Sequence, residues 1–271
     1  MANPSSPDTL SAGQIRCVVE GSTGWLLVDN PAKLNAMSLA MFKQLREHVT
    51  RLEDDPAVRC VILRGADGKA FCSGGDISEF EGFRTGPEGI AAYGRVGNAA
   101  LETLRTCPKP TIAMIEGYCM GGGVALALNC DLRIASQDAR LGIPAAKRGL
   151  SYDFADIKLL VDLIGPSATK NMLYTGRAFS AEEALRIGLI NELASVDELK
   201  AKVMKISDTI AANAPLSIAA AKFIVDTATT DPEKRDLHAC EAHFTKCMTS
   251  EDFAEANQAF AEKRRPAFKG R

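Results

Sequence analysis

Two glycine clusters constrain this chain more than any other feature. The first lies in the segment Ala70–Ile77 and contains the pair Gly74-Gly75, and the second lies in Gly117–Leu126 and contains Gly121-Gly122-Gly123. Each cluster follows an apolar run that is typical of a β-strand. Glycine permits tight turns and a close approach of a ligand to the backbone. Two such turns can direct backbone N–H groups into one site, where they would stabilise an oxygen atom that gains negative charge.

Length and composition indicate an ordinary globular protein. The 271 residues are enough for one large domain, or for a domain with an appendage, around a substantial core. The hydrophobic fraction of 46% and the formal net charge of -2 give no overall preference for nucleic acid. No stretch approaches the length of a membrane-spanning helix. We therefore expect neither a nucleic-acid partner nor a membrane-embedded segment.

Cysteine usage and the N-terminal residues favour a cytoplasmic location. Of the eight cysteines, five lie within or beside apolar strand or helix runs, which fits buried free thiols better than disulfides. These five are Cys17, Cys60, Cys72, Cys119 and Cys130. Residues 1–12 are polar, contain proline and serine, and lack the apolar run of a signal peptide. We expect them to form a flexible leader.

Residues 13–195 alternate between strand-like and helix-like segments, which predicts an α/β core. The expected strands are Ile15–Glu20, Gly24–Asp29, Arg59–Leu63, Thr111–Glu116 and Asp131–Ala135. Ser38 is a suitable cap for a helix whose apolar residues Met41, Leu45 and Val49 recur at helical spacing. The run Val124–Leu128 is apolar on all sides, which predicts a helix in the centre of the molecule.

Residues 196–271 show only helical patterns. One apolar stripe contains Leu199, Val203, Ile206 and Ile210, and another contains Ile218, Ala221, Ile224 and Val225. An apolar helical region that follows an α/β core needs a surface to pack against.

Several further segments match one family in order and spacing. They are "NPAKLNAMS" at residues 30–38, "CDLRIAS" at 130–136, "TGRAFSAEEALRIGLIN" at 175–191 and the ending "FAEKRRPAFKG". With the two glycine clusters, they make the chain resemble the crotonase, or enoyl-CoA hydratase/isomerase, family from about residue 15 to the C-terminus. The resemblance implies a spiral of ββα units followed by a helical region that packs into trimers, often paired as hexamers. It also implies an acyl-CoA thioester as the substrate, no separate cofactor or metal, and a role in fatty acid metabolism.

The resemblance assigns the two oxyanion-hole amides to Gly75 and Gly122. It also reveals a departure from the family pattern, because the two positions that hold catalytic glutamates in the family's hydratases are Ala125 and Ala145 here. Alanine neither donates nor accepts a proton. Water addition by the usual pair of carboxylates is therefore not supported by this sequence.

Other side chains near these motifs are candidates for the missing acid or base. Asp153 would act as a base on the thioester α-proton, as a nucleophile like the aspartate of the family's 4-chlorobenzoyl-CoA dehalogenase, or only as a helix cap. Tyr152 would donate a proton or line the pocket. Glu79 and Glu81 would supply a carboxylate or remain exposed charges. Asp76 adjoins the oxyanion hole, and it belongs to the site, caps the turn or pairs with a basic residue.

The resemblance also assigns residues to coenzyme A. Lys33, Ala70 and Ile77 occupy segments that line the adenine end of coenzyme A in the family. Phe260 and Lys263 match tail residues that reach the nucleotide of their own or a neighbouring subunit, and the alternative for Lys263 is a solvated basic face.

Two classes of function fit these features, and a third does not. The first is an acyl-CoA enzyme that stabilises an enolate-like intermediate, whose reaction is isomerisation, hydration, thioester hydrolysis or carbon–carbon cleavage. The second is a protein that binds acyl-CoA without turnover. The third, a serine peptidase on a related spiral, is disfavoured because no histidine lies near a nucleophile in the sequence. His238 and His243 do not predict a metal site either, since positions five apart do not face one way on a helix.

Overall fold

The larger of two β-sheets runs through the centre of the molecule. The computed structural model describes residues 13–79 and 86–271, and in this range the larger sheet has the strand order β1-β2-β3-β5-β7-β10. Its strands are β1 (Gln14–Glu20), β2 (Thr23–Asp29), β3 (Cys60–Gly65), β5 (Thr111–Ile115), β7 (Leu132–Ser136) and β10 (Glu192–Ala194). All five strands expected from the sequence are present, with ends that differ by at most two residues. β1 and β2 are antiparallel, and the other neighbours in this sheet are parallel.

The second sheet is smaller and places the glycine clusters side by side. Its strands, in order, are β4 (Ala70–Cys72), β6 (Tyr118–Met120), β8 (Arg140–Gly142) and β9 (Phe179–Ser180). β4, β6 and β8 are parallel neighbours, so their carboxyl ends lie at one edge. The segments that follow these three ends carry Gly75, Gly122 and Ala145. The fold therefore gathers the predicted site from three separate parts of the sequence.

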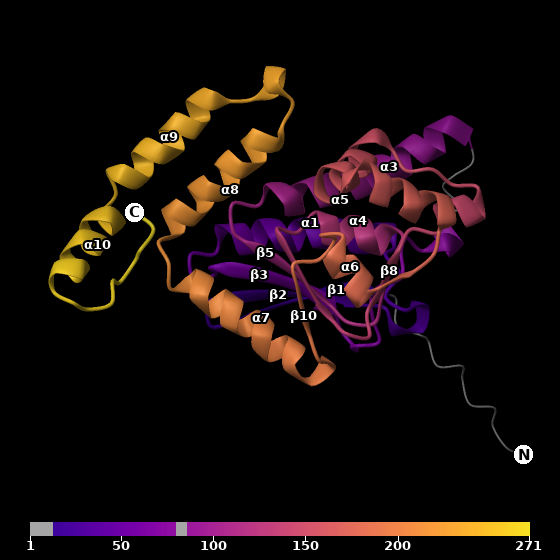
Figure 1. The fold of residues 1–271 in the computed structure, drawn as a ribbon, viewed down its shortest axis with the longest axis horizontal. Helices are drawn as coiled ribbons and strands as arrows, with labels where there is room; N and C mark the ends of the chain where they lie inside the picture. The colour runs from indigo at the N-terminus through magenta and orange to yellow at the C-terminus, as the bar shows by residue number, and fades with distance from the viewer. Residues whose placement is uncertain (1–12, 80–85) are drawn as a thin grey trace, which may run out of the picture.

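The chain repeats a strand–strand–helix pattern. β3 and β4 are followed by α3 (Gly86–Thr106), β5 and β6 by α4 (Gly122–Leu128), and β7 and β8 by α5 (Phe154–Thr175). In each repeat the first strand joins the larger sheet and the second joins the smaller one. This arrangement is the expected spiral of ββα units, and Figure 1 shows α3, α4 and α5 together on one side of the larger sheet.

Two of the core helices form as their sequences predict. α1 (Leu39–Asp54) begins after Ser38, whose side chain accepts a hydrogen bond from the Met41 N–H at 3.2 Å. α4 is buried on most of its surface, including Val124 and Leu126, and ends at Leu128. The remaining short elements are η1 (Pro31–Lys33), η2 (Ile77–Glu79), η3 (Ala145–Arg148), α6 (Ala181–Arg186) and η4 (Pro232–Lys234).

The cysteines of the core are free thiols, as expected. Cys60, Cys72, Cys119 and Cys130 are buried, whereas Cys17 is half-buried. Burial raises the pKa of Cys60 to about 11 and that of Cys72 to about 12. These thiols therefore act as small apolar side chains rather than as nucleophiles.

The C-terminal helices differ in how they pack. They are α7 (Val196–Ala211), α8 (Pro215–Thr229), α9 (Leu237–Met248) and α10 (Glu251–Ala261). α7 buries Leu199 and Val203 against the larger sheet, so the first predicted stripe covers the core. The second stripe is not covered within this chain, since Ile224 is 38% exposed and Val225 is 61% exposed. Figure 1 shows α9 and α10 at one end of the molecule, away from the sheets.

α9 and α10 leave further large apolar side chains exposed. These are Leu237, Phe244, Met248, Phe253 and Phe260. None of the described helices combines the length and the apolar character needed to cross a lipid bilayer.

The contact between α4 and β4 leads to a prediction about stability. A Cβ atom on Gly123 would lie 2.1 Å from the carbonyl oxygen of Cys72. Two backbone segments would have to separate, because neither side of this contact is a movable side chain. We expect Gly123→Ala to lower the free energy of unfolding by about 3 kcal/mol. Urea denaturation measures this change, and an unchanged midpoint would contradict the close contact.

Candidate active site

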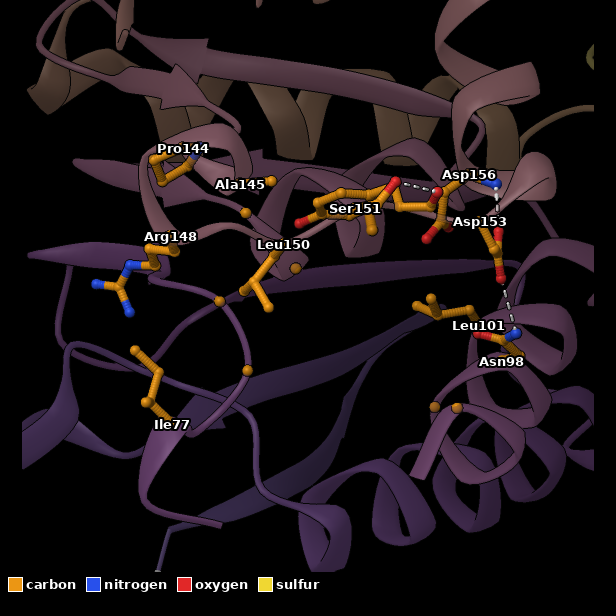
Figure 2. Close-up of a pocket in the computed structure, with 18 of the residues that line it drawn as sticks. Ile77, Asn98, Leu101, Pro144, Ala145, Arg148, Leu150, Ser151, Asp153 and Asp156 are labelled. Carbon is orange, nitrogen blue, oxygen red and sulfur yellow. Dashed lines mark hydrogen bonds between the residues drawn. The ribbon is translucent and has the colours of Figure 1, made fainter. Parts of the chain in front are cut away.

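A cavity of about 350 Å³ lies beside the carboxyl ends of β4, β6 and β8. Residues from both glycine clusters, from α3, from η3 and from the start of α5 line it. Figure 2 shows Ile77 and Arg148 on one side of this cavity, with Asp153, Asp156 and Asn98 on the other. The predicted oxyanion segments and the predicted aspartate therefore face one space.

The backbone around Gly75 leaves one amide available. The Met37 N–H donates to the Gly74 carbonyl at 2.8 Å, and the Asp76 N–H donates to the Met37 carbonyl at 2.8 Å. Between these two bonds, the Gly75 N–H has no backbone partner among the described residues. Gly75 lines the cavity, so its amide is free to bind an oxygen atom there.

The Gly122 amide is available because it begins a helix. Gly121 precedes α4 with φ 56°, a conformation that favours glycine, and its carbonyl accepts from Val124 at 3.0 Å. As the first residue of α4, Gly122 has no intrahelical acceptor for its N–H, and the described residues provide no other backbone acceptor. A Cβ atom on Gly122 would lie 3.2 Å from the Gly75 nitrogen, so the two glycine segments are in direct contact.

Ala125 and Ala145 occupy the positions inferred from the sequence. Both line the cavity, one from α4 and the other from η3, with exposed fractions of 6% and 8%. Their methyl groups form an apolar wall next to the oxyanion segments. The two predicted glutamate positions therefore lie in the interior of the cavity rather than at its periphery.

One face of α3 forms part of the cavity, which the sequence analysis did not predict. The lining residues Gly94, Gly97, Asn98 and Leu101 have the spacing of one helical face. Glycine and asparagine at such positions do not form an apolar stripe, so periodicity alone does not select them. Asn98 becomes notable only because the fold places it opposite α5.

Asp153 caps α5 and is held from two directions. Its Oδ1 accepts the Asp156 N–H at 3.0 Å, and its Oδ2 accepts an N–H of the Asn98 side chain at 3.2 Å. The prediction of a helix cap is confirmed. The same residue also lines the cavity, so capping and membership of the site are compatible.

Asp156 is a second carboxyl in the cavity that sequence reasoning missed. It lies in the first turn of α5 and is half-buried. Burial and the neighbouring Asp153 carboxylate raise the pKa of Asp156 to about 6. The signal available in the sequence was the spacing of the two aspartates, which places them on one turn of a helix.

The raised pKa of Asp156 predicts how stability depends on pH. The folded protein binds this proton more tightly than the unfolded chain, whose aspartates have a pKa of about 3.9. The protonated Asp156 therefore makes its full contribution to the free energy of unfolding below about pH 4, and this contribution is lost as the pH rises through about 6. Because the side chain is partly exposed, we expect Asp156→Asn to stabilise the fold by about 1 kcal/mol at pH 8 and not at pH 4. Denaturant titrations at both pH values measure this, and a destabilised variant at pH 8 would contradict it.

Tyr152 covers the second glycine cluster. Its hydroxyl oxygen lies 3.4 Å from the point where a Cβ atom on Gly121 would be, and the partly buried side chain packs against the core. It lines the cavity, as expected for a pocket residue.

Other predicted side chains are engaged outside the cavity. The Lys33 ammonium donates to Asp76 Oδ2 at 2.6 Å and to the Ser78 hydroxyl at 2.8 Å. Burial alone would raise the pKa of Asp76, but the hydrogen bonds that its carboxylate accepts from Lys33 and from Ser78 outweigh burial and lower that pKa. Asp76 thus pairs with a basic residue, which was one alternative to a role in the site. The Glu79 carboxylate accepts the Leu39 N–H at 2.8 Å and supports the start of α1 instead of supplying an acid or base to the cavity.

The residues assigned to coenzyme A are spread over the molecule. Ile77 is exposed at the cavity. Ala70 is buried in β4, and its carbonyl accepts from the Asn35 side chain at 2.6 Å. Phe260, in α10, is 87% exposed, and Lys263 follows that helix with φ 53°; neither lines the cavity. Glu81 and the leader 1–12 lie outside the described residues.

Comparisons with known proteins agree with this geometry. Residues 21–271 match the profile of the family described as enoyl-CoA hydratase/isomerase. The short-chain-enoyl-CoA hydratase of Clostridium acetobutylicum is 34% identical over 93% of this chain and 96% of its own. The carnitinyl-CoA dehydratase of Proteus mirabilis is 34% identical over 95% of this chain and 98% of its own. The crystal structure of an enoyl-CoA hydratase/carnithine racemase from Magnetospirillum magneticum superposes with a TM-score of 0.90 at 34% identity, covering 96% of this chain and 97% of that one.

Proposed function

Because this chain belongs to the enoyl-CoA hydratase/isomerase family and is an acyl-CoA enzyme, we propose that it moves the double bond of an enoyl-CoA thioester along the acyl chain. One observation carries the proposal. Two free backbone amides and an aspartate carboxylate line a single cavity together with Ala125 and Ala145, which we assign to the positions of the hydratase glutamates. This set provides what an allylic proton shift requires.

The amides of Gly75 and Gly122 bind the thioester oxygen. Removal of a proton from the α-carbon places negative charge on this oxygen, and two preorganised N–H donors stabilise that charge. Gly122 adds the positive end of the α4 helix dipole. The donors lie on elements packed into the core, so they need no rearrangement when the charge develops.

Asp153 is the base that removes the α-proton. Its carboxylate lies on a different wall from the alanines and is oriented by Asn98 and by the first turn of α5. Isomerisation requires a base at the acyl chain and no water molecule. Hydration would require groups that hold and activate water, and the methyl groups of Ala125 and Ala145 provide none.

The coenzyme A portion leaves the cavity on the side of Ile77 and Arg148. Both side chains are exposed there, and a guanidinium group suits the phosphates of the coenzyme. Lys33 and Ala70 remain predicted contacts of the adenine end. Phe260 and Lys263 do not line the cavity, so we place their predicted contact with the nucleotide in a neighbouring subunit.

Homotrimers, alone or paired as hexamers, are the proposed assembly. The exposed apolar side chains of α8, α9 and α10 support it, because single chains rarely leave so many large side chains in contact with water. Sedimentation equilibrium measures the number of chains. A protein that remains a monomer at micromolar concentration would contradict this assembly.

The reaction is tested with two substrates. We expect the purified protein to convert 3-hexenoyl-CoA into 2-hexenoyl-CoA and to form no 3-hydroxyhexanoyl-CoA from either compound, as followed by chromatography and mass. Rapid formation of the hydroxy product would identify a hydratase, as the names of the relatives suggest. Tight binding of both substrates with no product would overturn isomerisation and favour the alternative of acyl-CoA binding without turnover of these substrates.

A further inference from the structure

The two aspartates at the start of α5 differ in how freely they can move. Both oxygens of Asp153 accept hydrogen bonds, one from the backbone of its own helix and one from Asn98 on α3. The Asp156 carboxyl accepts no hydrogen bond from the residues that the structure describes. Figure 2 shows Asp153 directed toward Asn98. Asp153 is therefore held at one position, and Asp156 is the unconstrained carboxyl.

Asp153 and Asp156 lie at the boundary between this cavity and a second cavity. This second cavity, of about 300 Å³, lies between α3, α5 and the end of α8. Four residues line both cavities: Asn98, Leu101, Asp153 and Asp156. The second cavity is lined mainly by charged side chains, so an acyl chain is expected to stay in the first cavity, where Asp153 and Asp156 both belong to the lining.

The two hydrogen bonds of Asp153 limit its ability to carry out both proton transfers of an allylic shift. In such a shift one carbon loses a proton and the carbon two bonds further along gains one. A single carboxyl must reach both carbons, and the two hydrogen bonds of Asp153 restrict that movement. Asp156 is half-buried and holds its proton unusually well, with a pKa raised to about 6 by burial and by Asp153. It is thus suited to donate a proton near the position where Asp153 accepts one.

We propose that Asp156 is a second catalytic residue, which donates a proton to the γ-carbon of a 3-enoyl thioester while Asp153 removes the α-proton. This inference rests on the isomerisation proposed above. It assigns a function to a carboxyl that the oxyanion hole and Asp153 leave unused.

The step balances without any other reactant. The α-carbon–hydrogen bond breaks, its proton moves to Asp153, and its electron pair enters the dienolate whose oxygen the amides hold. The γ-carbon then takes the proton of Asp156, the double bond forms between the α- and β-carbons, and Asp156 becomes a carboxylate. Asp153 then loses its proton to solvent and Asp156 takes one from solvent, which restores the starting state.

Isotopic labelling tests the proposal. The substrate is 3-hexenoyl-CoA with two deuterium atoms on the α-carbon, in ordinary water, analysed by mass at low conversion. If Asp153 alone moved the proton, it would return deuterium to the γ-carbon. With two carboxyls, we expect the wild-type product to have lost one deuterium. Asp156→Asn should lower turnover by about 100-fold, and its residual product should retain that deuterium because Asp153 is the remaining carboxyl.

Asp197→Asn is the control for loss of a carboxylate near the start of a helix. Asp197→Asn removes an exposed carboxylate from the first turn of α7, and it should leave both the rate and the loss of deuterium unchanged. Retention of deuterium by the wild type would overturn the role of Asp156 while isomerisation itself stands. A slower Asp156→Asn variant that still loses deuterium would show a positioning role and overturn proton donation. Absence of isomerisation in the wild type would instead overturn the proposed function, and this inference with it.

Discussion

Gly122→Ala is expected to lower turnover by about 100-fold while the protein remains folded. The added Cβ atom would lie 3.2 Å from the Gly75 nitrogen and 3.5 Å from the Gly74 carbonyl carbon. Contacts this short force the two glycine segments apart by a few tenths of an ångström, which misaligns both donors. Loss of one oxyanion-hole donor typically lowers the rate by about 100- to 1000-fold. Steady-state kinetics with the isomerisation substrate measures the effect.

Thermal denaturation and ligand binding serve as controls for this variant. The shortest contact of the added Cβ atom is 3.2 Å at Gly122, whereas at Gly123 it is 2.1 Å, a collision with the Cys72 carbonyl. Gly122→Ala should therefore melt close to the wild type and still bind a saturated acyl-CoA. Unchanged turnover in a folded Gly122→Ala protein would show that these amides do not form the oxyanion hole.

Asp153→Asn is expected to lower turnover by 100-fold or more with little change in stability. Asparagine caps helices about as well as aspartate, so its side-chain oxygen still accepts the Asp156 N–H. It is not a base, and loss of a positioned base typically lowers a rate by about 100- to 10,000-fold. The measurement is the initial rate of isomerisation, with denaturation followed in parallel.

α9 offers a matched control for this change. Asp236 caps α9 in the same way, since its Oδ1 accepts the Ala239 N–H at 2.8 Å, and it lines neither cavity that contains Asp153. Asp236→Asn should leave the rate unchanged. If Asp153→Asn were as active as the wild type, the proposed base would be wrong and Asp153 would only cap its helix.

Much of the fold could be anticipated because the signals are local. Strands such as β3 and β5 are largely apolar runs, and Ser38 marks the start of α1 through a bond to a residue three positions away. Gly121 needs a conformation that favours glycine, so the turn before α4 is already apparent in the sequence. The helical stripe at Ile224 and Val225 is equally visible, yet its pattern does not reveal that this chain leaves it uncovered.

The candidate site was predictable only where short motifs define it. Gly75, Gly122, Ala125 and Ala145 could be named because each lies at a fixed place in a recognisable motif. Asp76 has the same proximity in sequence, but the structure turns it toward Lys33 and away from the cavity. Nearness along the chain does not determine the direction of a side chain.

The sequence by itself determined the two glycine segments that we propose to bind an oxyanion and the two alanines that we assign to glutamate positions, because each belongs to a short motif. Only the tertiary structure decided which polar side chains share a cavity with them. Asn98 and Asp153 are 55 positions apart, and their hydrogen bond exists because the ββα spiral packs α3 against the start of α5. The environment of Asp156 likewise depends on burial and on a neighbouring charge. Both are properties of packing between elements, which no local pattern of residues encodes.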